Sequence, residues 1–272
     1  MIYTKQSNDL KMKNNIALCL FTSTKGHFDI KTRYQETVKS LNRQVPIEDF
    51  GFAIAHIKVS EGEDEIGNEM QSFLESYGFT VIKTNAEWKH HNVSHQRQYL
   101  NDMFTVFSNP RVLECESALF LEDDMLLKPR EYELSYYMYR AGAILKTQPD
   151  IISVRIPRFE NEKYRIGHLR EKHQINSCVI ESEFPDLYFY GNDFSNNPHF
   201  CRPRDIRNAL ILMNKNAGAF MIHSEMGLGP SLKYFSDPDK CIAVFNPSQI
   251  VSRHIGTIIG EEELIERDYF YE

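Results

Sequence analysis

The chain has 272 residues, of which 42% are hydrophobic and 25% are charged, and its formal net charge is −7. This length is enough for one large α/β domain or two small ones. The acidic balance argues against a general nucleic-acid-binding surface, although it leaves room for a local basic groove. Its apolar runs fall short of the ~20 residues that a membrane-spanning helix needs.

Five cysteines are scattered through the sequence without a CxxC pair: Cys19, Cys115, Cys178, Cys201 and Cys241. An odd and dispersed set of this kind indicates reduced thiols rather than a disulfide framework. The first apolar run, residues 16–21, is too short for the core of a signal peptide. These features together predict a cytoplasmic protein.

The first half of the chain alternates between strand and helix patterns. Residues 1–15 are polar and lysine-rich, and we expect a flexible lead-in there. Apolar runs of strand length follow at residues 16–21, 52–59 and 79–82, and a fourth run ends at Glu122. Helical spacing separates these runs at residues 32–41, 67–77 and 94–107, with Gly78 as a helix stop signal. The alternation predicts an α/β fold with a mainly parallel central sheet and helices on both faces.

The second half is less regular. We predict helices at residues 131–146, 205–214 and 226–235, and strands at residues 151–156, 219–222 and 241–245. Between residues 158 and 197 lies a long polar stretch that is rich in aromatic residues. Such a stretch is typical of binding loops or of a small excursion of antiparallel strands.

Three consecutive acids, Glu122-Asp123-Asp124, follow the fourth apolar run, and another apolar run resumes at once. Acids bordered by core-type residues are costly unless a positive charge neutralises them. In an extended chain Glu122 and Asp124 would share a face at the carboxyl end of a strand, where α/β sheets bind ligands. Two hard oxygen donors there suit Mg²⁺ or Mn²⁺ carrying a phosphate substrate. The alternative is that the acids merely cap the strand or open the next turn.

The order of these elements, with an acidic motif closing the fourth strand, resembles the GT-A glycosyltransferases, the nucleotide-sugar-dependent group that includes the family 2 enzymes. Their metal motif is DxD or a near variant, and Glu122-Asp123-Asp124 would be an ExD form in which Asp123 could share the role. The resemblance implies a GT-A-like three-layer fold. It assigns residues 16–128 to a nucleotide-sugar-binding half and residues 129–260 to an acceptor-binding half of the same domain, followed by a tail at residues 261–272.

A second match precedes the fourth strand. The stretch Asn92-Val93-Ser94-His95-Gln96-Arg97 is similar to the NxGxxxARN stretch of many family 2-like enzymes, although it lacks the glycine and the final asparagine. The resemblance implies that Arg97 or His95 helps to hold the donor nucleotide or its diphosphate. A polar helix start with an exposed arginine would explain the same residues.

Two later matches concern the metal and the acceptor. Arg253-His254-Ile255-Gly256 follows the last predicted strand, where many GT-A enzymes place a histidine on the metal or on the donor diphosphate. His254 is a competent ligand for Mn²⁺, and Arg253 could pair with a phosphate. Glu225 stands near the start of a predicted helix, where inverting family members place their general base. A loop hydrogen bond for His254 and a helix-dipole contact for Glu225 are the structural alternatives.

The reaction that the resemblance implies is transfer of a sugar from a nucleoside diphosphate donor to a carbohydrate or other hydroxyl acceptor, with inversion. Mn²⁺ or Mg²⁺ held by Glu122, Asp124 and His254 would stabilise the leaving diphosphate. The turn Thr22-Ser23-Thr24 would contact the nucleoside. An acid after the second strand, Glu61 or Asp64, would accept a hydrogen bond from the base or the ribose.

Other functions fit parts of the same pattern. A sugar-phosphate nucleotidyltransferase uses a similar sheet and a carboxylate-bound Mg²⁺, but the turn at residues 22–26 has only one lysine and one glycine where such enzymes carry a glycine-rich basic loop. A non-catalytic carbohydrate-binding module would use the aromatic stretch, but it gives the three acids no purpose. Transfer to a DNA base would require a basic path for the phosphate backbone, which the net charge disfavours.

Overall fold

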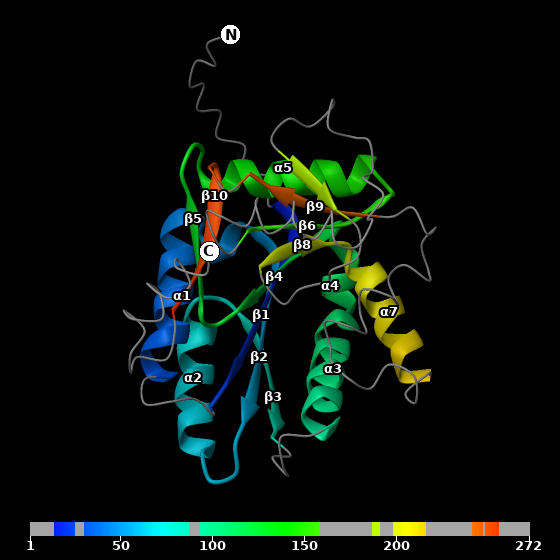
Figure 1. Cartoon of the computed structure of the whole chain (residues 1–272). Helices are drawn as coiled ribbons and strands as arrows, with labels where there is room; N and C mark the ends of the chain where they lie inside the picture. The colour runs from blue at the N-terminus through cyan, green and yellow to red at the C-terminus, as the bar shows by residue number, and fades with distance from the viewer. Residues whose placement is uncertain are drawn as a thin grey trace, which may run out of the picture.

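The computed structural model describes residues 14–24, 30–86, 93–157, 187–190, 198–215, 241–246 and 248–255. An eight-stranded sheet lies at the centre of this part of the chain (Figure 1). From one edge to the other, its strands are β3 (Thr80–Asn85), β2 (Phe50–Val59), β1 (Asn14–Ser23), β4 (Ser117–Glu122), β8 (His199–Cys201), β6 (Ile151–Arg155), β9 (Cys241–Phe245) and β7 (Leu187–Tyr190).

Most of the sheet is parallel. β1 pairs in parallel with β2 on one side and with β4 on the other, and β2 pairs in parallel with β3. β8 runs antiparallel between β4 and β6, so β6 points the same way as β4 and pairs in parallel with β9. The carboxyl ends of β1, β2, β4 and β6 therefore meet at one edge of the sheet, which is the edge where α/β proteins bind ligands.

Both faces of the sheet are covered by helices, because successive residues of the central strands point to opposite sides. Leu18 and Leu20 of β1 belong to a buried cluster with α1 (Ile30–Gln44), α2 (Asp64–Ser76) and α5 (Leu134–Thr147). Cys19 and Phe21 belong to a second cluster with α3 (Val93–Phe107), α4 (Pro110–Glu114) and α7 (Pro203–Lys215). The arrangement is the predicted three-layer α/β fold (Figure 1).

A second, two-stranded sheet begins directly after the three acids. β4 ends at Glu122, the chain turns at the next two residues, and β5 (Met125–Pro129) leaves the main sheet. β5 pairs antiparallel with β10 (Ile250–His254), and His254 stands opposite Met125. Met125, Leu127 and Ile250 are buried against the same cluster as α1 and α5. The pairing brings a segment from the end of the chain beside the acidic turn.

Most of the elements predicted from the sequence are confirmed, with shifted ends. α2 begins at Asp64 rather than at residue 67, and the left-handed φ of 90° at Gly78 follows its end as expected. The pattern did not predict the short elements η1 (Ile47–Asp49), α4, β5, β8 and β10. The predicted lead-in at residues 1–15 lies outside the described residues up to residue 13, and its last two residues belong to β1. The predicted strand at 219–222 and helix at 226–235 also lie outside the described residues. None of the helices that the structure describes is long and apolar enough to cross a membrane.

Candidate active site at the carboxyl edge of the sheet

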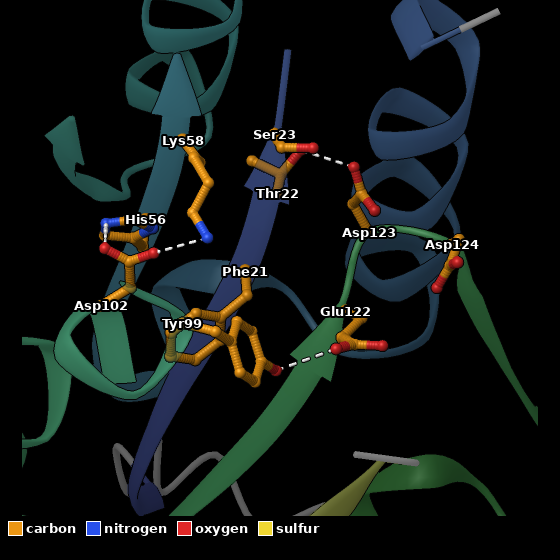
Figure 2. A pocket seen from close by; sticks show the side chains of 10 residues that line it. All are labelled: Phe21, Thr22, Ser23, His56, Lys58, Tyr99, Asp102, Glu122, Asp123 and Asp124. Carbon is orange, nitrogen blue, oxygen red and sulfur yellow. Dashed lines mark hydrogen bonds and ion pairs between the residues drawn. The ribbon is translucent and has the colours of Figure 1, made fainter. Parts of the chain in front are cut away.

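A pocket opens where β1, β2 and β4 end and α3 crosses them (Figure 2). It is lined by Phe21, Thr22, Ser23, His56, Lys58, Tyr99, Asp102, Glu122, Asp123 and Asp124. Its volume of about 190 Å³ compares with ~10–15 Å³ for the space that one water molecule needs. The pocket can therefore take a ligand of many atoms, and its polar lining comes mainly from acids, one lysine and one histidine.

Glu122 is the last residue of β4 and is partly exposed to the pocket. It stands opposite Phe21 in the parallel pairing of β4 with β1. The Tyr99 hydroxyl, on α3, donates a hydrogen bond of 2.9 Å to Glu122 Oε1. The carboxylate is thus held between the sheet edge and the helix that covers this face.

Asp123 is bonded to the end of β1 and anchors the acidic turn. Its side chain is buried, and its Oδ2 accepts a hydrogen bond of 2.5 Å from the Thr22 hydroxyl. Its backbone carbonyl accepts a hydrogen bond of 2.7 Å from the Thr37 hydroxyl, on α1. Burial, together with the neighbouring charge of Asp124, raises the pKa of Asp123 to about 6, although the bond from Thr22 and the charge of Arg33 act in the opposite direction. Negative charge is costly here, so a cation in the pocket would relieve it.

Asp124 completes the turn and is partly exposed. Its backbone carbonyl accepts a hydrogen bond of 2.5 Å from the backbone N–H of Ile255, which directly follows β10. Glu122 and Asp124 line the same pocket, as expected. However, the backbone between them does not stay extended as expected, because the chain turns at Asp123 and Asp124.

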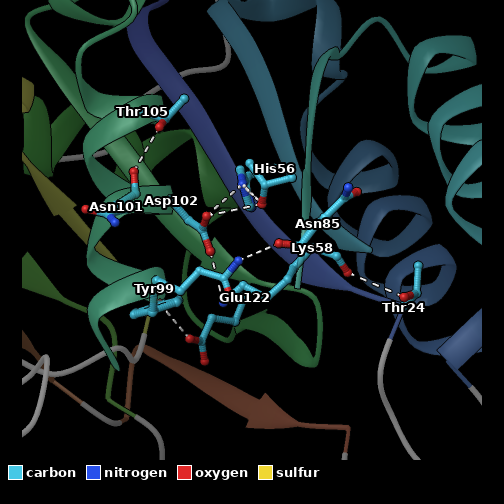
Figure 3. Close-up of polar contacts among 11 residues, drawn as sticks. Thr24, His56, Lys58, Asn85, Tyr99, Asn101, Asp102, Thr105 and Glu122 are labelled. Carbon is cyan, nitrogen blue, oxygen red and sulfur yellow. Dashed lines mark hydrogen bonds and ion pairs between the residues drawn. The ribbon is translucent and has the colours of Figure 1, made fainter. Parts of the chain in front are cut away.

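A buried network of charged groups forms the opposite wall of the pocket (Figure 3). Lys58 Nζ lies 2.9 Å from Asp102 Oδ2, and His56 Nε2 lies 3.3 Å from Asp102 Oδ1. The Thr84 hydroxyl, on β3, also contacts Asp102 Oδ1, at 3.2 Å. Burial raises the pKa of Asp102, but the hydrogen bonds and charges of His56 and Lys58 outweigh it, so the pKa lies below the ordinary value of 3.8. Asp102 therefore stays ionised and balances the charge of Lys58.

Four pocket residues were not predicted as site residues from the sequence: His56, Lys58, Tyr99 and Asp102. Two signals were present. His56 and Lys58 are two residues apart in an otherwise apolar strand, so they share one face near its carboxyl end. Asp102 follows Tyr99 by three residues, which places a charge on the apolar stripe of α3.

The predicted nucleoside-binding residues separate into two groups. Thr22 and Ser23 line the pocket. Thr24 is fully buried, and its hydroxyl accepts a hydrogen bond of 2.7 Å from the Ser60 backbone N–H, which joins the end of β1 to the turn after β2.

The two acids predicted after the second strand are exposed. Glu61 lies in the turn that follows β2, and Asp64 is the first residue of α2. The described lining of the pocket includes neither of them.

Several other predicted residues are described only in part. His95 and Arg97 lie in the first two turns of α3, but their side chains are outside the described part of the structure. The same holds for the His254 side chain, whose backbone pairs with Met125, next to Asp124. Arg253 is exposed on β10, and Glu225 lies wholly outside the described residues.

The donor set fits a hard divalent cation. Glu122 and Asp124 offer carboxylate oxygens, and Mg²⁺ is commonly bound through one or two carboxylates together with substrate phosphates. Within the described side chains, no three histidine, cysteine or acidic residues form a cluster that could hold a metal ion. A third protein ligand would therefore come from a side chain such as that of His254.

No protein-family model and no curated protein matches the chain in sequence. Solved structures do match. A crystal structure of GalNAc-T7 with UDP, GalNAc and Mn²⁺ matches with a TM-score of 0.51 at 8% sequence identity, over 90% of this chain and 44% of that chain. The apo form of mouse xyloside xylosyltransferase 1 matches with a TM-score of 0.44 at 13% identity, over 83% of both chains.

A 4-diphosphocytidyl-2C-methyl-D-erythritol synthase from Anaerococcus prevotii DSM 20548 matches with a TM-score of 0.44 at 9% identity, over 95% of this chain and all of that chain (100%). The match with GalNAc-T7 and the observed sheet order agree with the predicted architecture. The chain has a GT-A-like fold.

Proposed function

We propose that the protein is a metal-dependent glycosyltransferase that moves a sugar from a nucleoside diphosphate donor to an acceptor hydroxyl, with inversion. The observation that carries the proposal is the acidic turn at the end of β4. It borders a pocket at the carboxyl edge of a GT-A-like sheet, and Glu122 and Asp124 both line that pocket.

The charges of the pocket support the need for a divalent cation. The positive charge of Lys58 is balanced by Asp102 at 2.9 Å. The carboxylates of Glu122, Asp123 and Asp124 line the same pocket, where their negative charges would repel those of a diphosphate. A divalent cation between the acids and the diphosphate removes this repulsion and stabilises the charge that develops on the leaving group. The GalNAc-T7 structure of the same fold holds UDP and Mn²⁺.

The proposed roles follow the positions of the residues. Glu122 and Asp124, with His254, hold Mn²⁺ or Mg²⁺, and Arg253 contacts a phosphate. The position of β10 supports the roles of His254 and Arg253. In the pairing of β10 with β5, His254 stands opposite Met125 and Arg253 opposite Leu126, directly after the acids. In the pocket, Asp123 supports the turn that carries both metal ligands.

On the donor side, Thr22 and Ser23, the last two residues of β1, contact the nucleoside, and Thr24 joins the end of this strand to the turn after β2. His95 or Arg97 holds the nucleotide or its diphosphate, and Glu61 or Asp64 accepts a hydrogen bond from the base or ribose. On the acceptor side, Glu225 takes the hydroxyl proton while the acceptor oxygen bonds to the anomeric carbon and the bond to the diphosphate breaks.

A calorimetric titration of the full chain with UDP and GDP, with and without Mn²⁺, tests the proposal. One of the two nucleotides is expected to bind only in the presence of the metal. Asp124→Ala should abolish this binding, whereas Asp150→Ala, which removes an exposed acid before β6, should leave it unchanged. Equal binding in EDTA, or full binding by the Asp124→Ala protein, would contradict the proposal.

Product analysis separates the remaining functions. Hydrolysis or transfer of a nucleotide-sugar supports the glycosyltransferase, and Glu225→Gln should then slow turnover strongly while donor binding survives. Release of pyrophosphate from a nucleoside triphosphate and a sugar phosphate would instead identify a nucleotidyltransferase. Sugar binding without any metal-dependent nucleotide binding would identify a non-catalytic module.

A further inference from the structure

Tyr99 contacts both walls of the pocket (Figures 2 and 3). Its hydroxyl donates to Glu122 Oε1 at 2.9 Å, on the side of the acidic turn. Its ring centroid lies 5.7 Å from Lys58 Nζ, on the side of the buried charge network. The same ring lies 6.1 Å from the ring of Phe21, between the two walls.

The position of the ring is set by its neighbours rather than by the hydroxyl alone. Lys58 is held by Asp102, and Asp102 lies one helical turn after Tyr99 on α3. Phe21 stands opposite His56 on one side and opposite Glu122 on the other. The ring therefore has neighbours on β1 and β2 besides the hydrogen bond that its hydroxyl donates to Glu122.

We propose that Tyr99 is a positioning residue for the divalent cation of the pocket. The inference rests on the proposed function in that it needs a metal at Glu122 and Asp124. The hydrogen bond fixes one oxygen of the Glu122 carboxylate, because rotation of the group would break it, and so it sets the direction in which the group meets the cation. A polar contact that orients a metal ligand typically contributes 10–100-fold in metal affinity.

A purely structural role for the hydroxyl makes a different prediction. If it only satisfied a polar group in the pocket wall, its removal would change the stability of the protein and leave the metal affinity unchanged. Tyr99→Phe separates the two roles, because it keeps the ring, and with it the contacts to Phe21 and Lys58, and removes only the hydroxyl.

The experiment is a titration of the full chain with Mn²⁺ alone, in which electron paramagnetic resonance measures the free and bound ion. We expect Tyr99→Phe to weaken Mn²⁺ binding by about 10–100-fold and to alter the spectrum of the bound ion. Its unfolding midpoint in metal-free buffer should stay close to that of the wild type. The matched control is Tyr139→Phe on α5, where the side chain is 72% exposed and Mn²⁺ binding should not change.

Two further variants distinguish failure of this inference from failure of the proposed function. If Glu122→Gln and Asp124→Ala both bind Mn²⁺ as the wild type does, or if the wild type binds none, the metal site itself is wrong. If these variants lose the ion while Tyr99→Phe binds it with wild-type affinity and spectrum, only the role of Tyr99 is overturned. Loss in all three variants, with Tyr139→Phe unchanged, supports the inference.

Discussion

Lys58 of β2 and Asp102 of α3 form a buried ion pair, in which Nζ and Oδ2 are 2.9 Å apart and the two side chains are 7% and 4% exposed. Burying two charges costs several kcal/mol per ion before their attraction is counted. The pair lies in the wall of the candidate active site rather than deep between helix and sheet. Buried and strongly paired groups of this kind are concentrated at functional sites.

The first prediction concerns removal of one partner of this pair. Asp102→Asn leaves Lys58 buried without its counter-charge and should lower the free energy of unfolding at pH 7 by about 3 kcal/mol. The pKa of Asp102 in the folded protein is below its ordinary value of 3.8, so its ionisation stabilises the fold above that pH. This contribution is lost as the pH falls through the folded-state pKa. Urea unfolding should therefore show a difference between wild type and variant that is large at pH 7 and shrinks below pH ~4.

A matched control is the exposed pair of Lys146 and Glu116, which has the same distance of 2.9 Å but side chains that are 65% and 52% exposed. Glu116→Gln should change the free energy of unfolding by less than about 1 kcal/mol at either pH. Equal effects of the two substitutions would show that the Lys58–Asp102 pair is no stronger than a surface contact.

The second prediction tests the coupling within the pair. Replacing both partners, in Lys58→Met with Asp102→Leu, removes both buried charges, and apolar replacement of a buried pair is often neutral. The double variant should therefore be more stable than either single variant, with a coupling energy above about 3 kcal/mol in a double-mutant cycle. Additive losses from the two single substitutions would contradict this expectation. Urea unfolding of the four proteins at pH 7 gives the measurement.

The parts of the fold that the sequence predicted are those with a local periodic signal. β1, β2 and β4 are largely apolar runs, and α1, α2 and α3 carry apolar stripes, so each could be assigned from its own residues. The small sheet of β5 and β10 has no such signal. It depends on the pairing of Met125 with His254, which are far apart in the sequence, and each strand is only five residues long.

The candidate site was predictable to a similar extent. The acids after β4 interrupt an apolar stretch in an obvious way. A weaker signal comes from His56, Lys58 and Asp102. Single polar residues are common in strands and on helix faces, and each of these three could form its hydrogen bonds without the others. Their significance comes from the crossing of α3 over the end of β2, which is a tertiary relationship.

The third prediction compares two helical glycines. A Cβ at Gly67 of α2 would lie 2.9 Å from Val59 Cγ2 of β2, whereas a Cβ at Gly142 of α5 would have its closest contact at 3.8 Å, with Ser117 Oγ. Alanine is favoured over glycine by about 1 kcal/mol within a helix, but overpacking costs about 1–3 kcal/mol. Gly142→Ala should raise the free energy of unfolding, and Gly67→Ala should lower it. Thermal or urea unfolding measures both, and a gain at both positions would contradict the close packing of α2 on β2.

The fourth prediction concerns the anchor of the acidic turn. The Thr37 hydroxyl donates a hydrogen bond of 2.7 Å to the Asp123 carbonyl, and the Thr37 side chain is 2% exposed. Thr37→Val keeps the shape of the side chain but leaves this carbonyl without the bond, which should cost about 1–3 kcal/mol in the free energy of unfolding.

The control for this variant is Thr105→Val on α3, where an exposed hydroxyl donates a bond of 2.9 Å to the Asn101 carbonyl. Water can replace that bond, so the free energy of unfolding should change by less than about 0.5 kcal/mol. Urea unfolding of both variants in metal-free buffer measures the difference. Similar losses would mean that the bond from α1 to Asp123 is no stronger than a surface contact.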